Sequence, residues 1–484
     1  MHVHFVAVAG TGMGPLAGLL KSAGHEVTGS DTSFYPPMGP ALERWGVRLK
    51  EGFDPGHLEP RPDLVVIGNV CRPHNVEARA AIDGGMRYAS MAHTLAELVL
   101  EGRSPLVVGG THGKTTTSAM CAHVLEVAGL EPGFLIGGLP KNFESSFKLP
   151  GPRKLPLASG GPAPKRRAPF VVEGDEYDTA FFEKTPKFWH YRPEVGIVTS
   201  IEHDHIDIYP DPASYQQAFD GFVSRIPERG LLVASAHDPL VLDVARRAAA
   251  EVTYTCLASD DVTAVPPHWM GAPVAGRSEM DVFVGGSFAG RVVLRVPGEH
   301  NMRNALSALA ACCQGFGVDV KTAMNALETF DGVRRRQDLL YEARGVRVYD
   351  DFAHHPTAVR ETLAALASKH PGGTLFAVFE PRSATACRAL HQEDYAGAFG
   401  SAGRVVFAPL GRPDIAESER LDLGRLVSEL AARDVSAIAS TSVDAIVELL
   451  ALEARPGDTV ALLSNGAFGG IYDKLRASLD ARPA

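Results

Sequence analysis

Paired cysteines, long apolar runs and an excess of positive charge are all missing from this sequence of 484 residues. Its six cysteines contain no Cys-x-x-Cys pair, which favours reduced thiols in a cytoplasm over a disulfide framework or a zinc site. No stretch approaches about 18 consecutive apolar residues, so we expect no membrane-spanning helix. The N-terminus lacks the basic start and small-residue cleavage site of a signal peptide, and we interpret it as mature sequence.

The charge balance bears on the possible partners. The formal net charge is −10 at pH 7, whereas a generic nucleic-acid-binding protein needs a basic face to meet phosphates. The content of 45% hydrophobic and 21% charged residues is that of an average globular protein. We expect a cytoplasmic protein that acts on small molecules, without a nucleic-acid or membrane partner, as a monomer or weak homo-oligomer.

The order of the predicted elements indicates an α/β protein of three domains, which suits its length. Residues 1–104 alternate apolar strands with short helices, as a doubly wound parallel sheet does. Residues 105–330 repeat this alternation and add a predicted hairpin at 280–296 and a helix from near His300 to near Phe316. Residues 331–484 alternate again. The segment 148–169 is rich in proline, glycine and basic residues, and we interpret it as a mobile surface insertion.

The strongest local motif is GGTHGKTTT at 109–117, between an apolar strand and a helix. Backbone N–H groups of such a turn surround phosphate oxygens, and the helix N-terminus adds its positive end. Lys114 would offset phosphate charge and the Thr115 hydroxyl would bind Mg²⁺. Two of the glycines enclose three residues rather than the usual four. The motif predicts a nucleoside triphosphate site formed by Gly110, Thr111, Gly113, Lys114, Thr115 and Thr116.

A second glycine motif, AGTGMGPLAG at 9–18, is a weaker signal. Its last glycine comes one position too early for the dinucleotide-binding pattern. Asp31 ends the next predicted strand, where acids that bind ribose often lie. The segment is compatible with a diphosphate-sugar nucleotide, with a nicotinamide nucleotide, or with a turn that binds nothing. A nicotinamide oxidoreductase, the alternative from another class, would leave the phosphate loop unused.

Acids and histidines follow two buried strands of the middle block, in EGDEYD at 173–178 and EHDHID at 202–207. Because the ends of parallel strands share one edge of a sheet, Glu173 and His205 are predicted to reach a metal held by the phosphate loop. His203 is an alternative ligand. One carboxylate and one imidazole suit Mg²⁺ that bridges a phosphate to an acid substrate.

The remaining motifs flank this predicted site. GEHNMRNALSA at 298–308 places three polar residues in one helical turn, where they could contact adenine or ribose; capping of the helix is the alternative for one of them. RRR at 334–336 and YDDFAHHPT at 349–357 suit a site that closes over a triphosphate, although a solvated charge run is the ordinary interpretation of RRR. His354 and His355 together suggest a transition metal, but the sequence offers no further ligand at suitable spacing.

Over essentially the whole chain, these motifs resemble those of the three-domain Mur ligases of bacterial cell-wall synthesis. The resemblance implies a Rossmann-like N-terminal domain, a central P-loop ATPase domain and a Rossmann-like C-terminal domain. It implies an amide ligation in which the lactyl carboxylate of UDP-N-acetylmuramate attacks the γ-phosphorus of ATP, and an amine then attacks the acyl phosphate. The base that deprotonates the amine is not identified.

The resemblance also implies roles for individual residues. MgATP would be held by Lys114, Thr115, Glu173 and His205. The adenine side would be met by His300, Asn301 and Asn304, and ATP would be contacted from the third domain by Arg335 and Asp351. The UDP part of UDP-N-acetylmuramate would bind Gly12, Gly14, Ser30 and Asp31. The incoming peptide would bind His354, His355, Arg382 and Ser383.

Within the family, FEPRSAT at 379–385 and SNGAFGGI at 464–471 resemble the members that attach the tripeptide L-alanyl-γ-D-glutamyl-meso-diaminopimelate in peptidoglycan recycling. Members that attach L-alanine share every ATP motif and are the alternative. Ala384 stands where the tripeptide enzymes usually have Asn, which puts one peptide contact in doubt. Thr199 and Ser200 also depart from the family pattern. No lysine lies between Lys187 and Lys321, so the carbamylated lysine of several relatives has no counterpart there.

Overall fold

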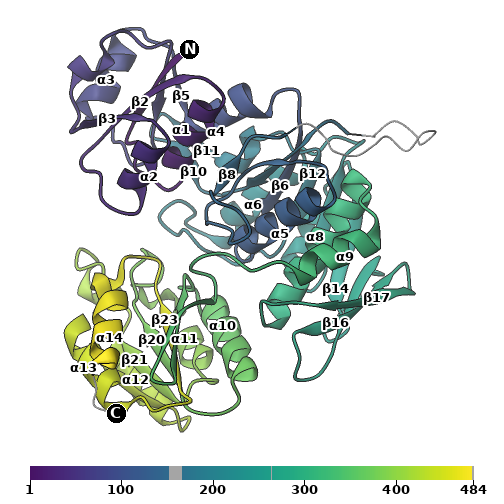
Figure 1. Ribbon diagram of the computed structural model, residues 1–484, viewed down its shortest axis with the longest axis vertical. Coiled ribbons are helices and arrows are strands. Elements are labelled where there is room, and N and C mark those ends of the chain that lie inside the picture. Colours follow the sequence, from purple (N-terminus) through teal and green to yellow (C-terminus); the bar gives the residue numbers. More distant parts are fainter. Residues whose placement is uncertain (152–165, 263, 482–484) are drawn as a thin grey trace.

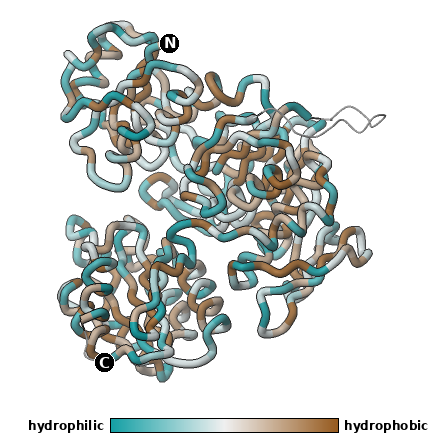
Figure 2. The backbone as a smooth tube through the Cα atoms, in the orientation of Figure 1, coloured by the Kyte–Doolittle hydropathy of each residue, from teal (hydrophilic) through white to brown (hydrophobic). Residues whose placement is uncertain are grey.

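A computed structural model describes residues 1–151, 166–262 and 264–481 of the chain. It has three α/β lobes, with the first and third lobes both beside the middle one (Figure 1). Apolar residues lie inside each lobe and polar residues cover it (Figure 2). No helix among the described residues is both long enough and apolar enough to cross a membrane.

The N-terminal lobe is built on a parallel sheet with the strand order β3-β2-β1-β4-β5, as a doubly wound fold predicts. The central strands β1 and β4 are buried over most of their length, as strands covered by helices on both faces are. The strands are β1 (His2–Val6), β2 (Glu26–Asp31), β3 (Arg48–Glu51), β4 (Leu64–Ile67) and β5 (Tyr88–Ser90). The helices are α1 (Met13–Ser22), α2 (Met38–Arg44), α3 (Val76–Asp83) and α4 (Met91–Leu95).

The middle lobe contains a ten-stranded sheet among its described residues, in the order β17-β16-β15-β14-β13-β12-β6-β9-β7-β8. Its first-half strands are β6 (Ser104–Gly109), β7 (Gly133–Leu135), β8 (Phe147–Lys148), β9 (Pro169–Glu173), β10 (Asp178–Ala180) and β11 (Glu183–Pro186), of which β10 and β11 form a separate pair. The others are β12 (Val195–Val198), β13 (Leu231–Ser235), β14 (Glu251–Leu257), β15 (Trp269–Pro273), β16 (Glu279–Val284) and β17 (Ser287–Val293). The helices are α5 (Lys114–Val127), α6 (Pro212–Val223), α7 (Pro239–Ala245), α8 (Glu299–Phe316) and α9 (Val320–Glu328).

The C-terminal lobe has a six-stranded sheet in the order β18-β19-β23-β20-β21-β22, parallel except for the β18–β19 pair. Its strands are β18 (Asp338–Ala343), β19 (Val346–Asp351), β20 (Leu375–Phe379), β21 (Arg404–Phe407), β22 (Ser436–Ala439) and β23 (Thr459–Leu463). Its helices are α10 (Pro356–Lys369), α11 (Gln392–Ala398), α12 (Leu423–Ala431), α13 (Val443–Glu453) and α14 (Ile471–Asp480).

The register of the middle sheet places the site. Strands β9, β6 and β12 are adjacent and parallel, with Val108 opposite Glu173 and Gly109 opposite Val198. The loops that follow all three strands therefore meet at one edge of the sheet. The predicted hairpin is β16–β17 and the predicted helix is α8, whereas α9 lies in a stretch for which no element was predicted.

Most of the predicted surface insertion at 148–169, namely residues 152–165, lies outside the described residues. Basic residues at its described ends are engaged with the middle lobe. Lys148 Nζ lies 2.7 Å from a Glu126 carboxylate oxygen, and Arg167 donates to Glu194 Oε1 at 2.9 Å. These ends are therefore part of the lobe rather than a solvated loop.

Candidate active site

The phosphate loop connects β6 to α5, and two of its glycines have left-handed backbone angles. Gly110 has a φ of 138° and Gly113 a φ of 79°. A Cβ on Gly110 would lie 1.9 Å from Thr199 Oγ1, so a side chain has no room there. Lys114 is the first residue of α5, and its ammonium folds back over the loop to donate to the Gly110 carbonyl at 2.6 Å. The loop thus presents backbone N–H groups, a helix N-terminus and one lysine to the same point.

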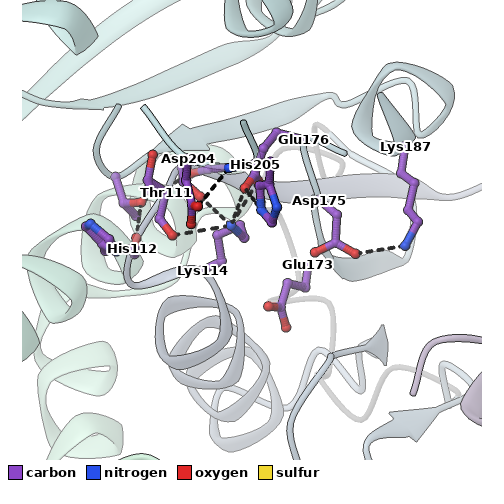
Figure 3. A network of polar contacts seen from close by, with 12 residues as sticks. Thr111, His112, Lys114, Glu173, Asp175, Glu176, Lys187, Asp204 and His205 are labelled. Carbon is purple, nitrogen blue, oxygen red and sulfur yellow. Dashed lines mark hydrogen bonds and ion pairs between the residues drawn. The ribbon is translucent and has the colours of Figure 1, made fainter. Parts of the chain in front are cut away.

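Glu176 joins Lys114 to His205, and we had not singled it out from the sequence. Its carboxylate is 2.9 Å from Lys114 Nζ and 3.1 Å from His205 Nε2, and its side chain is 1% exposed. Burial alone would raise the pKa of Glu176, but Lys114 and His205 lower that pKa to about 2. Burial alone would lower the pKa of Lys114, which Glu176 and Asp175 raise instead. Lys114 and Glu176 are therefore held in their charged forms, and Figure 3 shows Lys114, Glu176 and His205 pointing toward one another.

Glu173 lies apart from this group and makes different contacts (Figure 3). Thr115 Oγ1 donates to its carboxylate at 2.7 Å, and the Gly137 N–H donates at 2.6 Å. Burial and the neighbouring Asp175 raise the pKa of Glu173. A carboxylate, a hydroxyl and a second acid nearby are oxygen ligands of the kind that Mg²⁺ prefers, and a cation would relieve their repulsion.

His205 does not meet Glu173, its predicted partner in metal binding. Its ring pairs with Glu176 instead, and its backbone has a left-handed φ of 52°. Burial alone would lower the pKa of His205, but the hydrogen bond and charge of Glu176 raise it. The oxygen ligands lie at Thr115 and Glu173, and His205 as a third ligand stays a prediction.

The arginines at the start of the third lobe point in different directions. Arg335, the predicted ATP contact, pairs with Asp350 at 3.1 Å and donates to the Ser464 carbonyl at 2.8 Å, inside its own lobe. Arg336 reaches the phosphate loop, where it donates to Thr115 Oγ1 at 3.3 Å. The left-handed φ of Arg335, 61°, turns the chain between them.

The predicted adenine-side residues lie against both the loop and the third lobe. A Cβ on Gly113 would be 2.4 Å from Asn304 Oδ1, so this amide lies directly over the loop. His300 Nε2 and Asn301 Nδ2 each lie 3.2 Å from the side chain of Gln337. Asp351 accepts the Gln337 N–H at 2.6 Å and thereby holds this contact in place.

The residues predicted to bind UDP are engaged within the N-terminal lobe. Ser30 is fully buried and donates to Glu77 at 2.8 Å, and Asp31 accepts the Ala9 N–H at 2.9 Å. A Cβ on Gly14 would lie 2.3 Å from Met38 Sδ, so Gly14 allows α1 and α2 to pack. Gly12, the remaining residue of this set, is half-buried. A Cβ placed on Gly12 would lie 3.4 Å from the terminal methyl carbon of Met91.

A large cavity opens elsewhere, between the N-terminal and middle lobes. Its volume is about 910 Å³, and residues of both lobes line it. The N-terminal lobe contributes the loop after β4, where Asn69 donates to Asp178 at 3.2 Å across the two lobes. Its lining includes Asn69 and Arg72 of the N-terminal lobe and Tyr177, Lys184 and His205 of the middle lobe. Sequence reasoning missed this loop because its only signal is that GNVCRP ends an apolar strand.

The predicted peptide-binding residues follow β20 and β19. The Arg382 side chain is 48% exposed, packs against Gly411 and Gly466, and lies 3.7 Å from Glu380. Ser383 Oγ accepts the Ala386 N–H at 3.0 Å. Thr385 donates to Asp204 of the middle lobe at 2.8 Å, which brings this turn to the loop that carries His205.

His355 also reaches that loop, whereas His354 contacts its own segment. His355 Nδ1 lies 3.2 Å from Glu202 of the middle lobe, and His354 Nδ1 lies 3.0 Å from the Phe352 carbonyl. Together these contacts place an ATP-type phosphate loop, a substrate-sized cavity and a third-lobe turn around one sheet edge. The arrangement is that of an enzyme which brings a nucleotide and two further reactants together.

Profiles of one family match successive parts of the chain. The Mur ligase family catalytic domain matches residues 2–103, the Mur ligase middle domain 108–312, and the Mur ligase glutamate ligase domain 335–466. The chain belongs to the Mur ligase family.

Individual relatives add detail. The chain is 40% identical to the UDP-N-acetylmuramate–L-alanyl-gamma-D-glutamyl-meso-2,6-diaminoheptandioate ligase of Escherichia coli (strain K12), over 98% of this chain and 97% of the relative. It is 36% identical to the UDP-N-acetylmuramate–L-alanine ligase of Kineococcus radiotolerans, over 81% of this chain and 78% of the relative. The crystal structure of a murein peptide ligase from Psychrobacter arcticus 273-4 superposes with a TM-score of 0.73 at 35% identity and covers all of both chains.

Proposed function

We propose that this chain joins UDP-N-acetylmuramate to the tripeptide L-alanyl-γ-D-glutamyl-meso-diaminopimelate, as a step of peptidoglycan recycling. The chain is an ATP-dependent carbon–nitrogen ligase. The E. coli relative, which is named for these two reactants, is 40% identical over nearly the full length of both chains. Relatives named for L-alanine have lower identity, 36% over 81% of this chain in one case and 33% over 96% in another.

One structural observation carries the proposal: the phosphate loop and the 910 Å³ cavity meet at a shared group of side chains. His205 lines the cavity and contacts Glu176, and Glu176 contacts Lys114 of the loop. A nucleotide-linked acid in the cavity would therefore reach the terminal phosphate of a nucleotide on the loop. Arg72 and Lys184, both exposed at the cavity, supply positive charge suited to a diphosphate.

The chemistry takes two steps. A carboxylate oxygen of UDP-N-acetylmuramate bonds to the γ-phosphorus of ATP while the bond from that phosphorus to the ADP oxygen breaks. The peptide amine then bonds to the acyl carbon, phosphate leaves, and the amine loses a proton. Lys114 is placed to offset the negative charge that spreads over the phosphoryl oxygens in the first step.

Magnesium belongs to the proposal as well. Thr115 and Glu173, which already share a hydrogen bond, would hold it, with Asp175 adding charge. Bound there, Mg²⁺ would supply positive charge beside the phosphate oxygens. His205, whose ring also contacts Glu176, stays in the proposed set of metal ligands.

Residues from the third lobe complete the proposed ATP site. The proposed ATP contacts from this lobe are Arg335, Asp351 and Arg336. Arg336 is included because it donates a hydrogen bond to Thr115. Asp351 acts through Gln337, which it fixes against His300. The domain boundaries after residues 104 and 330, a cytoplasmic location and a monomer or weak homo-oligomer remain predictions.

The substrate assignment is tested with purified full-length protein, Mg²⁺, ATP and UDP-N-acetylmuramate. Phosphate release is measured with the tripeptide and with L-alanine in turn, and the product is identified by mass spectrometry. We expect the tripeptide to give the higher kcat/KM. A higher value with L-alanine would assign the chain to the L-alanine branch of the family.

Arg382 sharpens this test. A tripeptide carries several carboxylates and L-alanine one, and a guanidinium fork suits a carboxylate. Because Arg382 is 48% exposed, we expect Arg382→Ala to cost about 2 kcal/mol, the lower end for a lost charge pair, which is a roughly 30-fold rise in the tripeptide KM. The KM values for ATP and UDP-N-acetylmuramate should stay within about twofold. Unchanged tripeptide kinetics would remove Arg382 from the peptide site and leave the ligase assignment standing.

A further inference from the structure

Three side chains from separate parts of the chain meet beside the phosphate loop. His112 belongs to the loop itself, Glu202 follows β12, and His355 precedes α10 of the third lobe. Glu202 Oε2 lies 3.1 Å from His112 Nε2 and 3.2 Å from His355 Nδ1. The paired histidines of the sequence had no further ligand nearby in the chain, and the fold supplies two.

The hydrogen bonds of His355 leave one of its ring nitrogens unsatisfied. Its side chain is 7% exposed, and its Nε2 is buried with no hydrogen-bond partner among the described residues. Its Nδ1 faces both the Glu202 carboxylate and, at 3.4 Å, the Thr357 N–H. If Nδ1 carries the proton, the lone pair of Nε2 is buried without a hydrogen-bond donor. If Nε2 carries the proton, the lone pair of Nδ1 faces the Glu202 carboxylate. Either tautomer has a free-energy cost, and a cation bound to Nδ1, with the proton on Nε2, would remove the second of these costs.

The neighbouring His391 has the same property. Its ring lies 4.7 Å from the His355 ring, centroid to centroid. Its Nδ1 is 3.0 Å from Asp394, and its Nε2 is buried without a partner in the described part of the chain. A carboxylate on one ring nitrogen and a free lone pair on the other is the arrangement that orients metal-binding histidines.

The spacing of the three donors fits a transition metal. Adjacent ligands around tetrahedral Zn²⁺, with bonds of about 2.0–2.1 Å, are about 3.3 Å apart. The two measured separations, 3.1 and 3.2 Å, match this value, and all three ligand atoms lie within 4.8 Å of one another.

We propose that His112, Glu202 and His355 bind one transition-metal ion of the zinc class, with a fourth position open to water or to His391. Two imidazoles and one carboxylate suit Zn²⁺, Co²⁺ or Ni²⁺ and not Mg²⁺, which prefers oxygen ligands. The site is therefore distinct from the oxygen-rich position at Thr115 and Glu173. Because its ligands come from the middle and third lobes, the metal fixes the third lobe against the phosphate loop.

A second group of similar composition serves as the control. His93, Glu183 and His190 also lie within 4.8 Å of one another, between the N-terminal and middle lobes. His93 is 57% exposed, and His190 Nε2 already lies 2.9 Å from Thr185 Oγ1. None of its members has a buried, unpartnered ring nitrogen among the described residues. We therefore place the metal at His355 and not at His93.

Cobalt is the probe, because tetrahedral Co²⁺ absorbs strongly in the visible range. Full-length protein is treated with a chelator and titrated with CoCl₂ in 5 mM MgCl₂ without nucleotide, and Zn²⁺ is then added in competition. We expect one Co²⁺ per chain, displaced by Zn²⁺ and not by Mg²⁺. Outer-shell changes cost metal sites roughly 10- to 100-fold in affinity, so His355→Gln and Glu202→Gln should each lose at least about 100-fold.

His93→Gln is the matched control and should bind Co²⁺ as the wild type does. Circular dichroism and Tm are recorded for every variant; should His355→Gln not fold, His112→Gln decides in its place. Wild-type protein without a tetrahedral Co²⁺ spectrum would overturn the proposal, as would loss of binding in His93→Gln with binding intact in His355→Gln. These readouts require no substrate, so they stand apart from any test of the ligase reaction.

Discussion

Two strand–turn–helix units of this chain look alike in sequence and serve different ends. One runs from β1 through the glycines at 10–14 into α1, and the other from β6 through the phosphate loop into α5. In the phosphate loop, Gly110 and Gly113 have positive φ, and a lysine folds back over them. In the first unit Gly12 has an ordinary φ of −96°, and the Met38 side chain occupies the space beside Gly14.

The difference shows what a glycine-rich turn needs before it can hold a phosphate. Left-handed backbone angles turn successive N–H groups toward one point, and a nearby cation adds charge. None of the glycines at 10–14 has a left-handed angle, although Ala7 of the same turn does, with a φ of 66°. Asp31 caps the turn by accepting the Ala9 N–H. Gly12 and Gly14 face Met91 and Met38, so we consider the loop at Asn69 and Arg72 as a second candidate for the nucleotide end of the acid substrate.

The largest expected effect is that of Lys114→Ala. Removing one preorganised charge from a phosphoryl-transfer site commonly costs on the order of 10²–10³ in rate. Phosphate release should therefore fall by at least this factor, while circular dichroism shows a folded protein. Lys21→Ala, in the last turn of α1, is the control and should retain full activity. Wild-type turnover in folded Lys114→Ala would show that the two turns do not differ in function.

A paired glycine substitution tests the comparison directly. Gly110→Ala forces a side chain into a φ of 138° and against Thr199, a strain of about 1–3 kcal/mol before the clash. We expect it to weaken ATP binding by at least tenfold, measured by calorimetry. At Gly12 the φ of −96° permits alanine, and the nearest atom to the added Cβ would be 3.4 Å away. Gly12→Ala should therefore hardly change ATP affinity or Tm. Equal effects of the two substitutions would contradict our distinction between the turns.

Sequence alone predicted the elements whose signals are local. A strand, a glycine turn and Lys-Thr at the start of a helix lie within a dozen residues, and each reinforces the others. The choice between Glu173 and Glu176 was beyond reach, because both lie in one hexapeptide. Which of them meets Lys114 depends on the irregular chain after β9, which has no periodic pattern.

The third lobe presents the same difficulty. RRR at 334–336 predicts that an arginine closes over ATP, but the turn at Arg335 sends Arg335 and Arg336 to opposite sides. A positive φ at a non-glycine residue has no signal in the sequence. The cavity was missed for another reason, since residues from two lobes line it and only tertiary packing brings them together.

A smaller effect is expected at the cavity. Arg72→Ala removes an exposed positive charge, and we expect the KM for UDP-N-acetylmuramate to rise roughly tenfold, about 1.4 kcal/mol, with an unchanged KM for ATP. Asp31→Asn is the counterpart in the β1 turn and should alter Tm more than this KM, because its carboxylate caps the backbone. A larger rise in KM for Asp31→Asn would return the nucleotide site to the β1 turn.

The smallest effect is a pH dependence of stability that arises at the phosphate loop. The folded protein lowers the pKa of Glu176 to about 2, so the stability from this group is present above about pH 4.5 and is lost as the pH falls through 2. Burial opposes protonation of His205, but Glu176 raises its pKa above 6.5. Its contribution is therefore complete below pH 6.5 and is lost as the pH rises through the raised value. The His205 side chain is 31% exposed, so solvent screens part of this contribution.

The measurement compares the wild type with His205→Asn, a change that suits the left-handed φ of 52° at this position because asparagine tolerates it. Other titrating groups are shared by the two proteins and cancel in the difference of their Tm values. We expect that difference to be largest near pH 6 and to shrink as the pH rises toward 9, because folded His205 then loses its proton. A difference that stayed constant or grew between pH 6 and pH 9 would show that the charged His205–Glu176 pair adds nothing to stability. Among the described residues, the corresponding β1 turn has no charged pair of this kind over its glycines, so Gly12→Ala should show no such change with pH.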